Sequence, residues 1–491
     1  MRAAPLVERD RLSGRSLVSG SAVQMGGRAA AIVLQAASVA LLTRLLGQAR
    51  FGDFSAGLAT VGIVAAVAEF GLTAMAVVRM GRGEAARSVV RSCALASLVT
   101  GLVGLAIAVP TSFALFDASK RLALWVLLPG TAVELGGIGL VAYWQHRLAF
   151  ARNALASAAG QAVGCALVAV VLLDGRRLGE SAQFLAVGGA MLAASATVVA
   201  LLVPRGPDRL AGAPRSPAAR DVRSLLLAAL PLGLAGSLSL MHMRADQVIL
   251  AALGYRRSLA SYAIAYQVLQ GVVVAVGSVG AVGFSFMAAS SSGDRARHAR
   301  RSAALLCDLG VVASAGVALL APVAVYLLGG SSYDGALHVS RLLAPVVVLS
   351  VGNTMAGRVL IVEGRARSLV YVASGALLVN VALCLLLIPR YGIGGAAVAT
   401  VSSEALGAAL VVAIAERAVP TSQPVAILVV AAVGSTAAAL TSASSSGGVP
   451  VSLGLWAATL VGCLLLSREA WSRRDPLRAG APCALEEPDA R

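Results

Sequence analysis

Long apolar stretches alternate with short polar segments along almost the whole chain of 491 residues. A helix needs about 20 apolar residues to cross a bilayer, and a window of that length predicts fourteen spans. The spans cover approximately 17–43, 54–78, 89–110, 122–145, 154–173, 182–203, 223–242, 260–286, 303–328, 337–357, 368–388, 393–415, 424–441 and 449–467. Only helices and closed barrels satisfy every backbone group in lipid, and these runs are too long for barrel strands. The pattern therefore predicts an all-α integral membrane protein.

Composition agrees with the apolar pattern. Residues of the types AVILMFWYC make up 58% of the chain and charged residues 13%, against about 25% charged in an ordinary globular protein. No polar segment between spans is long enough for a separate folded domain, which excludes a soluble enzyme. The first apolar stretch contains Arg28 and is too long and too polar for a cleaved signal peptide, so we expect it to be retained as the first membrane helix.

The distribution of positive charge predicts the orientation in the membrane. An even number of crossings places both termini on one side, and the loops and tails of that side hold most of the basic residues behind the net charge of +17. Cytoplasmic loops are rich in Arg and Lys. We therefore expect a multi-pass protein of the cytoplasmic membrane with both termini in the cytoplasm, and no nucleic-acid partner.

The segment PRGPDRLAGAPRSPAARDVR is the longest polar stretch between spans and follows the sixth span. Weak matches recur around it at nearly equal offsets: Gly47 with Gly254, and WQHRLAFAR from Trp144 with GRVLIVEGR from Gly357. Transporters built from two such repeats bind substrate between them. The expected organisation is a cytoplasmic N-terminus (1–16), a first lobe with helices 1–6 (17–203), a cytoplasmic linker (204–223), a second lobe with helices 7–12 (224–418), two added helices (419–470) and a cytoplasmic tail (471–491).

The most specific motif is NVALCLLLIPRYGIGGAAVATVSSE, residues 380–404. One apolar helix ends at Pro389, a tight turn uses Tyr391 and Gly392, and a helix rich in small residues follows. This motif resembles the polysaccharide flippase branch of the multidrug/oligosaccharidyl-lipid/polysaccharide superfamily, in which a similar pattern joins helices eleven and twelve. The segments RLLGQARFGDFS, RADQVILAALG, LLGGSSYDGA and EGRARS show the same resemblance, which extends to about residue 415.

The resemblance implies two parallel six-helix lobes and transport by alternating access. It also implies a flippase that moves undecaprenyl-pyrophosphate-linked oligosaccharide across the cytoplasmic membrane for surface polysaccharide biosynthesis. The implied partners are the polyprenyl-pyrophosphate-linked glycan, membrane lipids, a polysaccharide polymerase and an initiating glycosyltransferase.

Three alternatives stay open. A drug/cation antiporter of the MATE type belongs to the same superfamily, although an exporter of cations has little use for Arg28 in the middle of a span. A membrane glycan polymerase would need a larger extracytoplasmic loop than this chain offers. A lipid II flippase is the third alternative. Those flippases carry Ala-Asp-Arg in helix 8, where this chain has Ala265, Tyr266 and Gln267, and their helix 1 arginine falls on Ser38. Both differences weaken this alternative.

Charges inside the spans are the first candidates for function, because each costs about 2.5–3.5 kcal/mol at a helix centre on insertion scales. Arg28 shares a helix face with Gln24 and Gln35. Its guanidinium suits bidentate binding of a pyrophosphate, and an ion pair with Glu69 that joins helices 1 and 2 explains it equally well. The ion-coupling candidates, for a proton or a sodium ion, are Glu69, Glu134, Asp246 and Glu404, with a paired helix contact as the alternative for each.

Helices 7 and 8 supply the remaining candidates for the substrate cavity. His242 titrates near neutral pH when unperturbed and shares a face with Asp246, while Arg244 is suited to attract phosphate. An ordinary interfacial cluster explains these residues as well. Helix 8 presents three polar side chains on one face, suited to a sugar path or to the membrane interface: Tyr262, Tyr266 and Gln270.

Other chemistry is absent from the sequence. The four histidines are dispersed without an H-E-x-x-H motif, and no cysteine pair has C-x-x-C spacing. Lys120 is the only lysine and precedes Arg121, so the chain has no Walker A loop. The glycines from Gly392 to Ala397 match G-x-G-x-x-A, but the run before them is membrane-length rather than a short strand. We therefore expect a transporter, not an enzyme, with no metal site and no cofactor.

Overall fold

The computed structural model describes residues 14–147, 149–175, 178–205, 219–289, 292–418, 422–444 and 449–472. Regular structure in these ranges is helical throughout, which confirms the all-α prediction, and ten segments are long and apolar enough to cross a membrane. The helices are α1 (Gly14–Glu69), α2 (Leu72–Gly81), α3 (Ala86–Leu115), α4 (Ala118–Gly136), α5 (Ile138–His146), α6 (Phe150–Gly175), α7 (Glu180–Leu202), α8 (Ala219–Ala252), α9 (Arg256–Ala289), α10 (Ser292–Gly329), α11 (Gly335–Leu343), α12 (Val346–Val362), α13 (Ala366–Ala418), α14 (Ser422–Ser444) and α15 (Val449–Ser472), with a 3-10 turn at Ser331–Tyr333.

Two of these helices each supply two of the expected spans, because a glycine interrupts them. Gly47 in α1 has φ 69° and Gly392 in α13 has φ 55°, a left-handed conformation that glycine adopts at little cost. The expected turn at Tyr391 and Gly392 is therefore present. The last two expected spans correspond to the shorter apolar segments Val429–Leu440 and Val451–Leu466 in α14 and α15.

One expected span ends too early. The seventh was placed at 223–242, whereas α8 continues to Ala252. Hydropathy alone stops at the polar residues that follow His242, but the structure pairs these residues with polar groups on neighbouring helices and so keeps them inside the helix. The pairing is described below.

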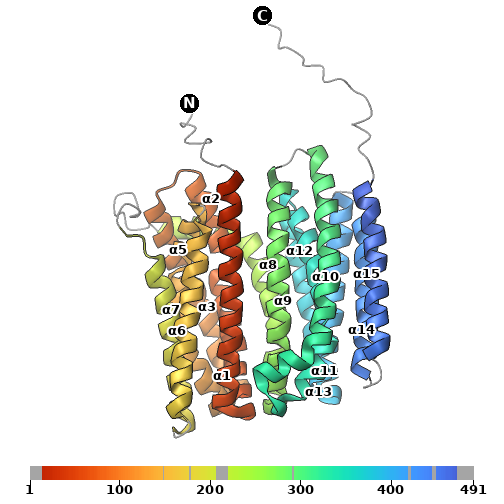
Figure 1. Ribbon diagram of the computed structural model, residues 1–491. Coiled ribbons are helices and arrows are strands. Elements are labelled where there is room, and N and C mark those ends of the chain that lie inside the picture. The colour runs from red at the N-terminus through yellow and green to blue at the C-terminus, as the bar shows by residue number, and fades with distance from the viewer. Residues whose placement is uncertain are drawn as a thin grey trace, which may run out of the picture.

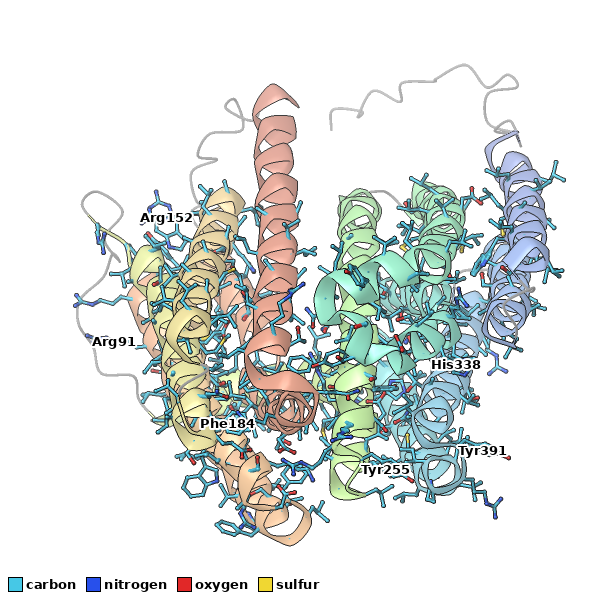
Figure 2. All side chains as sticks on the ribbon, turned by 60° about the horizontal axis from the view of Figure 1, so that its bottom comes forward. Arg91, Arg152, Phe184, Tyr255, His338 and Tyr391 are labelled. Carbon is cyan, nitrogen blue, oxygen red and sulfur yellow. The ribbon has the colours of Figure 1, made fainter. Side chains whose placement is uncertain are left out.

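The helices form two groups that stand side by side (Figure 1). We call α1–α7 the first lobe and α9–α13 the second lobe, and α14 and α15 pack on α10 at the edge of the second lobe. We assign α8 to neither lobe, because it contacts both groups, although the expected second lobe includes it. The start of α1 and the end of α15 lie at the same end of the molecule (Figure 1), which we call the terminus face. The other end, where Figure 2 labels Tyr255 and Tyr391, is the opposite face.

Helix α8 packs against both lobes. It contacts α1, α2 and α3 on one side and α13 on the other. Leu225 and Ala229, near its beginning, belong to an apolar cluster of the first lobe, whereas Leu250 and Ala251, near its end, belong to the large cluster that includes the second lobe. The helix therefore forms a wall between the two lobes.

A glycine allows α8 to cross the first lobe closely. The crossing point is the break between α1 and α2, where Phe70 has φ 41° and Gly71 has φ 67°. A Cβ on Gly233 of α8 would lie 2.2 Å from the carbonyl oxygen of Phe70. The two backbones can approach this closely only because position 233 has no side chain.

Candidate functional site

A cavity of about 530 Å³ lies between the lobes, in the half of the molecule nearer the terminus face. Its first-lobe wall is the end of α1 with the break before α2, and its other walls come from the middle of α8, α9, the end of α12 and both arms of α13. The charged and amide side chains that line it are Glu69, His242, Asn353, Arg358 and Glu404.

A contact between a histidine of α8 and a carboxylate of α13 forms part of the cavity wall. His242 Nδ1 lies 3.6 Å from Glu404 Oε2, and His242 Nε2 lies 2.8 Å from the hydroxyl of Ser403. The other carboxylate oxygen of Glu404 accepts a hydrogen bond from Ser350 at 3.1 Å and lies 3.5 Å from Asn353 Nδ2. Polar partners on α12 and α13 thus satisfy the hydrogen-bonding groups of His242 and Glu404 in the cavity wall.

Asp246, one turn further along α8, is fully buried. Its carboxylate accepts hydrogen bonds from the hydroxyls of Tyr262 and Thr400, the latter at 3.0 Å, and from the backbone N–H of Gln247 at 2.7 Å. Three donors replace the water that this acid loses on burial. They also explain why α8 continues past its polar residues.

Arg244 of α8 lies between α9 and α1. Its Nη2 donates to Gln270 Oε1 at 3.2 Å, and its guanidinium carbon lies 5.6 Å from the centre of the Tyr266 ring, within cation–π range. A Cβ on Gly62 of α1 would lie 3.6 Å from Arg244 Nε. The structure thus holds a cation against the first lobe, with two of the predicted helix 8 residues as its support.

At the opposite face the lobes are joined by a set of polar contacts that we call the seal: Asp53, Ser119 and Lys120 of the first lobe with Arg256 and the carbonyl of Ala251. Arg256 donates two hydrogen bonds to the fully buried Asp53, the one from Nε at 2.8 Å. Ser119 donates to the same carboxylate at 2.7 Å. The Lys120 ammonium, 3% exposed as a residue, donates to the Ala251 carbonyl at the end of α8 at 3.0 Å.

Asp117 supports the seal from outside the membrane spans. Its side chain accepts from the backbone N–H of Lys120 at 3.1 Å and lies 3.2 Å from the Lys120 ammonium. Burial acts to raise the pKa of Asp117, but these hydrogen bonds, with the charges of Lys120 and Arg256, outweigh it and lower the pKa below 3.8. The carboxylate therefore stays ionised beside the lysine.

Backbone contacts extend the join around Gly47. The hydroxyl of Thr43 donates to the carbonyl of Leu328 in α10 at 2.6 Å, and Gln48 donates to Ser261 of α9 at 3.4 Å. Figure 2, which brings the opposite face forward, labels Tyr255 at the turn between α8 and α9; its hydroxyl donates to a carbonyl just before the break in α13 at 3.4 Å. These contacts join the lobes at the opposite face, beyond one end of the cavity.

The residues that the sequence nominated are distributed unevenly over these features. Glu69, His242 and Glu404 meet in the cavity, while Arg244, Tyr266 and Gln270 meet beside it. Tyr262 and Asp246 pair in the buried interior. Gln35 and Glu134 are exposed on their helices. The side chains of Gln24 and Arg28 lie outside the described part of the structure, so the anion-contact prediction for Arg28 stays a prediction.

Several residues of the site were not anticipated. Arg358 is a charged residue at the edge of an expected loop, and Asp53 is a charged residue in the RLLGQARFGDFS segment. These positions gave each of them a weak signal in the sequence. Ser403 lies in the 380–404 motif and so had the same weak signal. Asn353 and Ser350 had none, because a hydroxyl or amide in an apolar helix is common and its partners lie on other helices.

Sequence and structure comparisons agree with this architecture. The family model described as polysaccharide biosynthesis protein matches residues 17–288. Among solved structures, the chain resembles the lipid II flippase MurJ in an inward closed conformation (TM-score 0.65, 12% identity, 93% of this chain and 98% of that chain). It also resembles an inward-facing MATE multidrug transporter of the MOP superfamily (0.59, 16%, 81% and 98%) and a MOP superfamily transporter from Pyrococcus furiosus described as having a binding pocket of reverse polarity (0.57, 17%, 82% and 95%).

No curated protein matches the sequence. The identities to the solved structures establish the fold alone, which is that of the MOP transporters. The family match covers more than half of the chain and includes the first lobe, the α8 wall and most of α9. This chain therefore belongs to the polysaccharide biosynthesis protein family.

Proposed function

We propose that the protein is a flippase that moves undecaprenyl-pyrophosphate-linked oligosaccharide from the cytoplasmic to the outer leaflet. The observation that carries the proposal is the asymmetry between the two ends of the lobe interface: a polar cavity near the terminus face and a charged seal at the opposite face. Such an arrangement suits one state of an alternating-access cycle, in which only one end admits substrate at a time.

In this proposal the terminus face is cytoplasmic and the cavity receives the pyrophosphate and the first sugars. Arg244 supplies a positive charge already oriented by Gln270 and Tyr266, and Arg28 adds a second guanidinium from α1. The amide and hydroxyl groups of α12 suit sugar hydroxyls, while the polyprenyl chain stays in lipid. When the seal breaks, the lobes separate at the opposite face and the glycan leaves on the outer side, toward a polymerase.

A drug/cation antiporter is the second candidate, favoured by one observation. Two carboxylates, Glu69 and Glu404, line the same cavity, and such groups suit a cationic substrate. Arg358 lines the same cavity, however, and its positive charge opposes a cationic substrate. We therefore place this candidate second.

Deletion of the gene in its host, followed by analysis of lipid-linked sugars, tests the choice. Accumulation of lipid-linked oligosaccharide on the cytoplasmic leaflet, reversed by the wild-type gene, supports the flippase. Unchanged glycans with increased sensitivity to cationic drugs support the antiporter instead. In complementation, we expect Arg28→Ala to lose transport and Arg28→Lys to retain part of it, and full transport by Arg28→Ala would remove this residue from the site.

A further inference from the structure

We propose that His242 and Glu404 form a proton-binding pair in the cavity wall, with the shared proton on His242 Nδ1. The proposal rests on the proposed function, because it assigns to the substrate cavity a charge that changes with protonation. The hydrogen-bond partners of Ser403 lead to an assignment of the histidine tautomer.

Ser403 has one hydroxyl proton, and the structure accounts for it. The hydroxyl donates to the carbonyl of Thr400 at 3.1 Å and accepts from Asn380 Nδ2, also at 3.1 Å. The orientation of the Asn380 amide is consistent with this assignment, since its oxygen faces the thiol of Cys384 at 3.8 Å. With the hydroxyl proton directed to the Thr400 carbonyl, we assign the remaining contact of Ser403, at 2.8 Å to His242 Nε2, to a ring N–H that donates to the oxygen.

With Nε2 protonated, the state of Nδ1 decides the charge of the pair. In a neutral ring, Nδ1 would carry a lone pair and face Glu404 Oε2 at 3.6 Å, which is repulsive when the carboxylate is ionised. The other oxygen of Glu404 accepts from the Ser350 hydroxyl and faces an Asn353 amide N–H. With an imidazolium, Nδ1–H faces Oε2 and the Ser350 and Asn353 donors face Oε1, so each oxygen of Glu404 lies opposite a donor.

Other charged and titratable groups surround the pair on four elements. Glu69 of α1 and Arg358 of α12 line the same cavity. On α8, Arg244 is directed to Gln270 and Tyr266, and Asp246 is satisfied by Tyr262, Thr400 and a backbone N–H. On α9, the tyrosines Tyr262 and Tyr266 are buried. The His242 ring is directed between Ser403 and Glu404, so Glu404 is the acid that faces Nδ1.

The position of the pair determines where its proton exchanges. His242 is 5% exposed and Glu404 is 7% exposed, and both line the cavity, so water reaches them from the space that also receives substrate. With its proton the pair is neutral overall, and without it the pair carries one negative charge. Loss of the proton therefore opposes binding of an anionic pyrophosphate, and by linkage the bound anion favours retention of the proton.

Nitrogen NMR of the full-length protein in lipid bilayers, labelled with ¹⁵N-histidine, tests the pair without requiring transport. The chain has four histidines, and loss of one signal in His242→Gln identifies the ring. We expect a doubly protonated His242 at pH 7 in the wild type and a ring protonated on Nε2 alone in Glu404→Gln. The exposed His338 on α11 gives the matched control, because His338→Gln should leave the His242 signal unchanged.

Unchanged signals of the other three histidines in Glu404→Gln would show that the variant is folded, and Glu404→Asp should keep the second proton on the ring. A singly protonated His242 in the wild type would overturn the proposal. A doubly protonated His242 in Glu404→Gln would do the same, because the carboxylate would then not be its partner. A doubly protonated ring in a protein that moves no lipid-linked glycan would leave the pair intact and overturn only the proposed function.

A second experiment tests whether the pair couples protons to transport. Proteoliposomes would carry lipid-linked oligosaccharide extracted from the deletion strain, with an imposed pH difference across the membrane. We expect the wild-type transport rate to change with the direction of the pH difference and the rate of His242→Gln to lose this dependence, while His338→Gln keeps it. An equal dependence in wild type and His242→Gln would refute the coupling.

Discussion

Neutralising one residue of the seal should open the opposite face by a measurable factor. In Asp53→Asn the buried carboxylate becomes a neutral amide, so the two hydrogen bonds from Arg256 no longer end on a negatively charged group. A hydrogen bond to a charged group contributes about 1.5–3 kcal/mol. Because the Arg256 side chain is 41% exposed, solvent screens part of the effect, and we take about 2 kcal/mol. At about 1.4 kcal/mol per factor of ten, the population open at the opposite face should rise about 30-fold.

The chain carries its own reporter for this change. Lys120 is the only lysine, and as a residue of the seal it is 3% exposed. A water-soluble amine reagent should modify it in proportion to the time for which the seal is open. The rate of modification of the Lys120 peptide, followed by mass spectrometry, should therefore rise about 30-fold in Asp53→Asn, as worked out above.

The control is Arg257→Gln, which removes an exposed charge next to Arg256 without touching the seal, and its Lys120 should react at the wild-type rate. Equal rates in Asp53→Asn and the wild type would refute the assignment of Asp53 and Arg256 as a structural tie between the lobes. A rate that rises equally in Arg257→Gln would assign the effect to general surface charge instead.

The other predictions concern packing, pH and topology. Gly233→Ala should destabilise the protein by about 1–3 kcal/mol, measured by thermal unfolding in detergent, because the new Cβ would meet the carbonyl of Phe70. Gly236→Ala is the control, because a Cβ there would have nothing within 4 Å, and it should be nearly neutral. Equal losses of stability in the two variants would refute the close crossing. The stabilisation from Asp117 is present at neutral pH and is lost as pH falls through its lowered pKa, below 3.8. The rate at which the amine reagent modifies Lys120, corrected for amine protonation, should therefore rise below about pH 4. Asp117→Asn should abolish this rise at acid pH. Reporter fusions at the two termini should both signal the cytoplasm, and opposite signals would refute the proposed orientation.

The helices were predictable from the sequence because membrane spans follow from length and hydropathy alone. The break in α13 was predictable too, since Pro389 and Gly392 each act locally on the backbone. The end of α8 was not. Hydropathy records the cost of Arg244 and Asp246 inside an apolar helix but not the partners on α9 and α13 that offset it.

The cavity was predictable only in part, for the same reason. His242, Glu69 and Glu404 were nominated because charged or titratable groups are rare in apolar helices. Which of them meet depends on which helix faces pack together, and the sequence shows no such pairing. Two contacts illustrate this. Glu404 of α13 meets His242 of α8, and Asp53 meets Arg256, which lies about two hundred residues further along the chain.

The interruption at Gly47 divides α1 into two straight arms, and the second arm runs without a break to Glu69. Asp53 near one end of this arm belongs to the seal and Glu69 at the other end lines the cavity, about 24 Å apart at 1.5 Å per residue. One continuous helix arm therefore holds a residue of the seal near one end and a residue of the cavity wall at the other. Because Asp53 and Glu69 lie on the same continuous arm, a shift of this arm on loss of the seal would also move the cavity wall at Glu69.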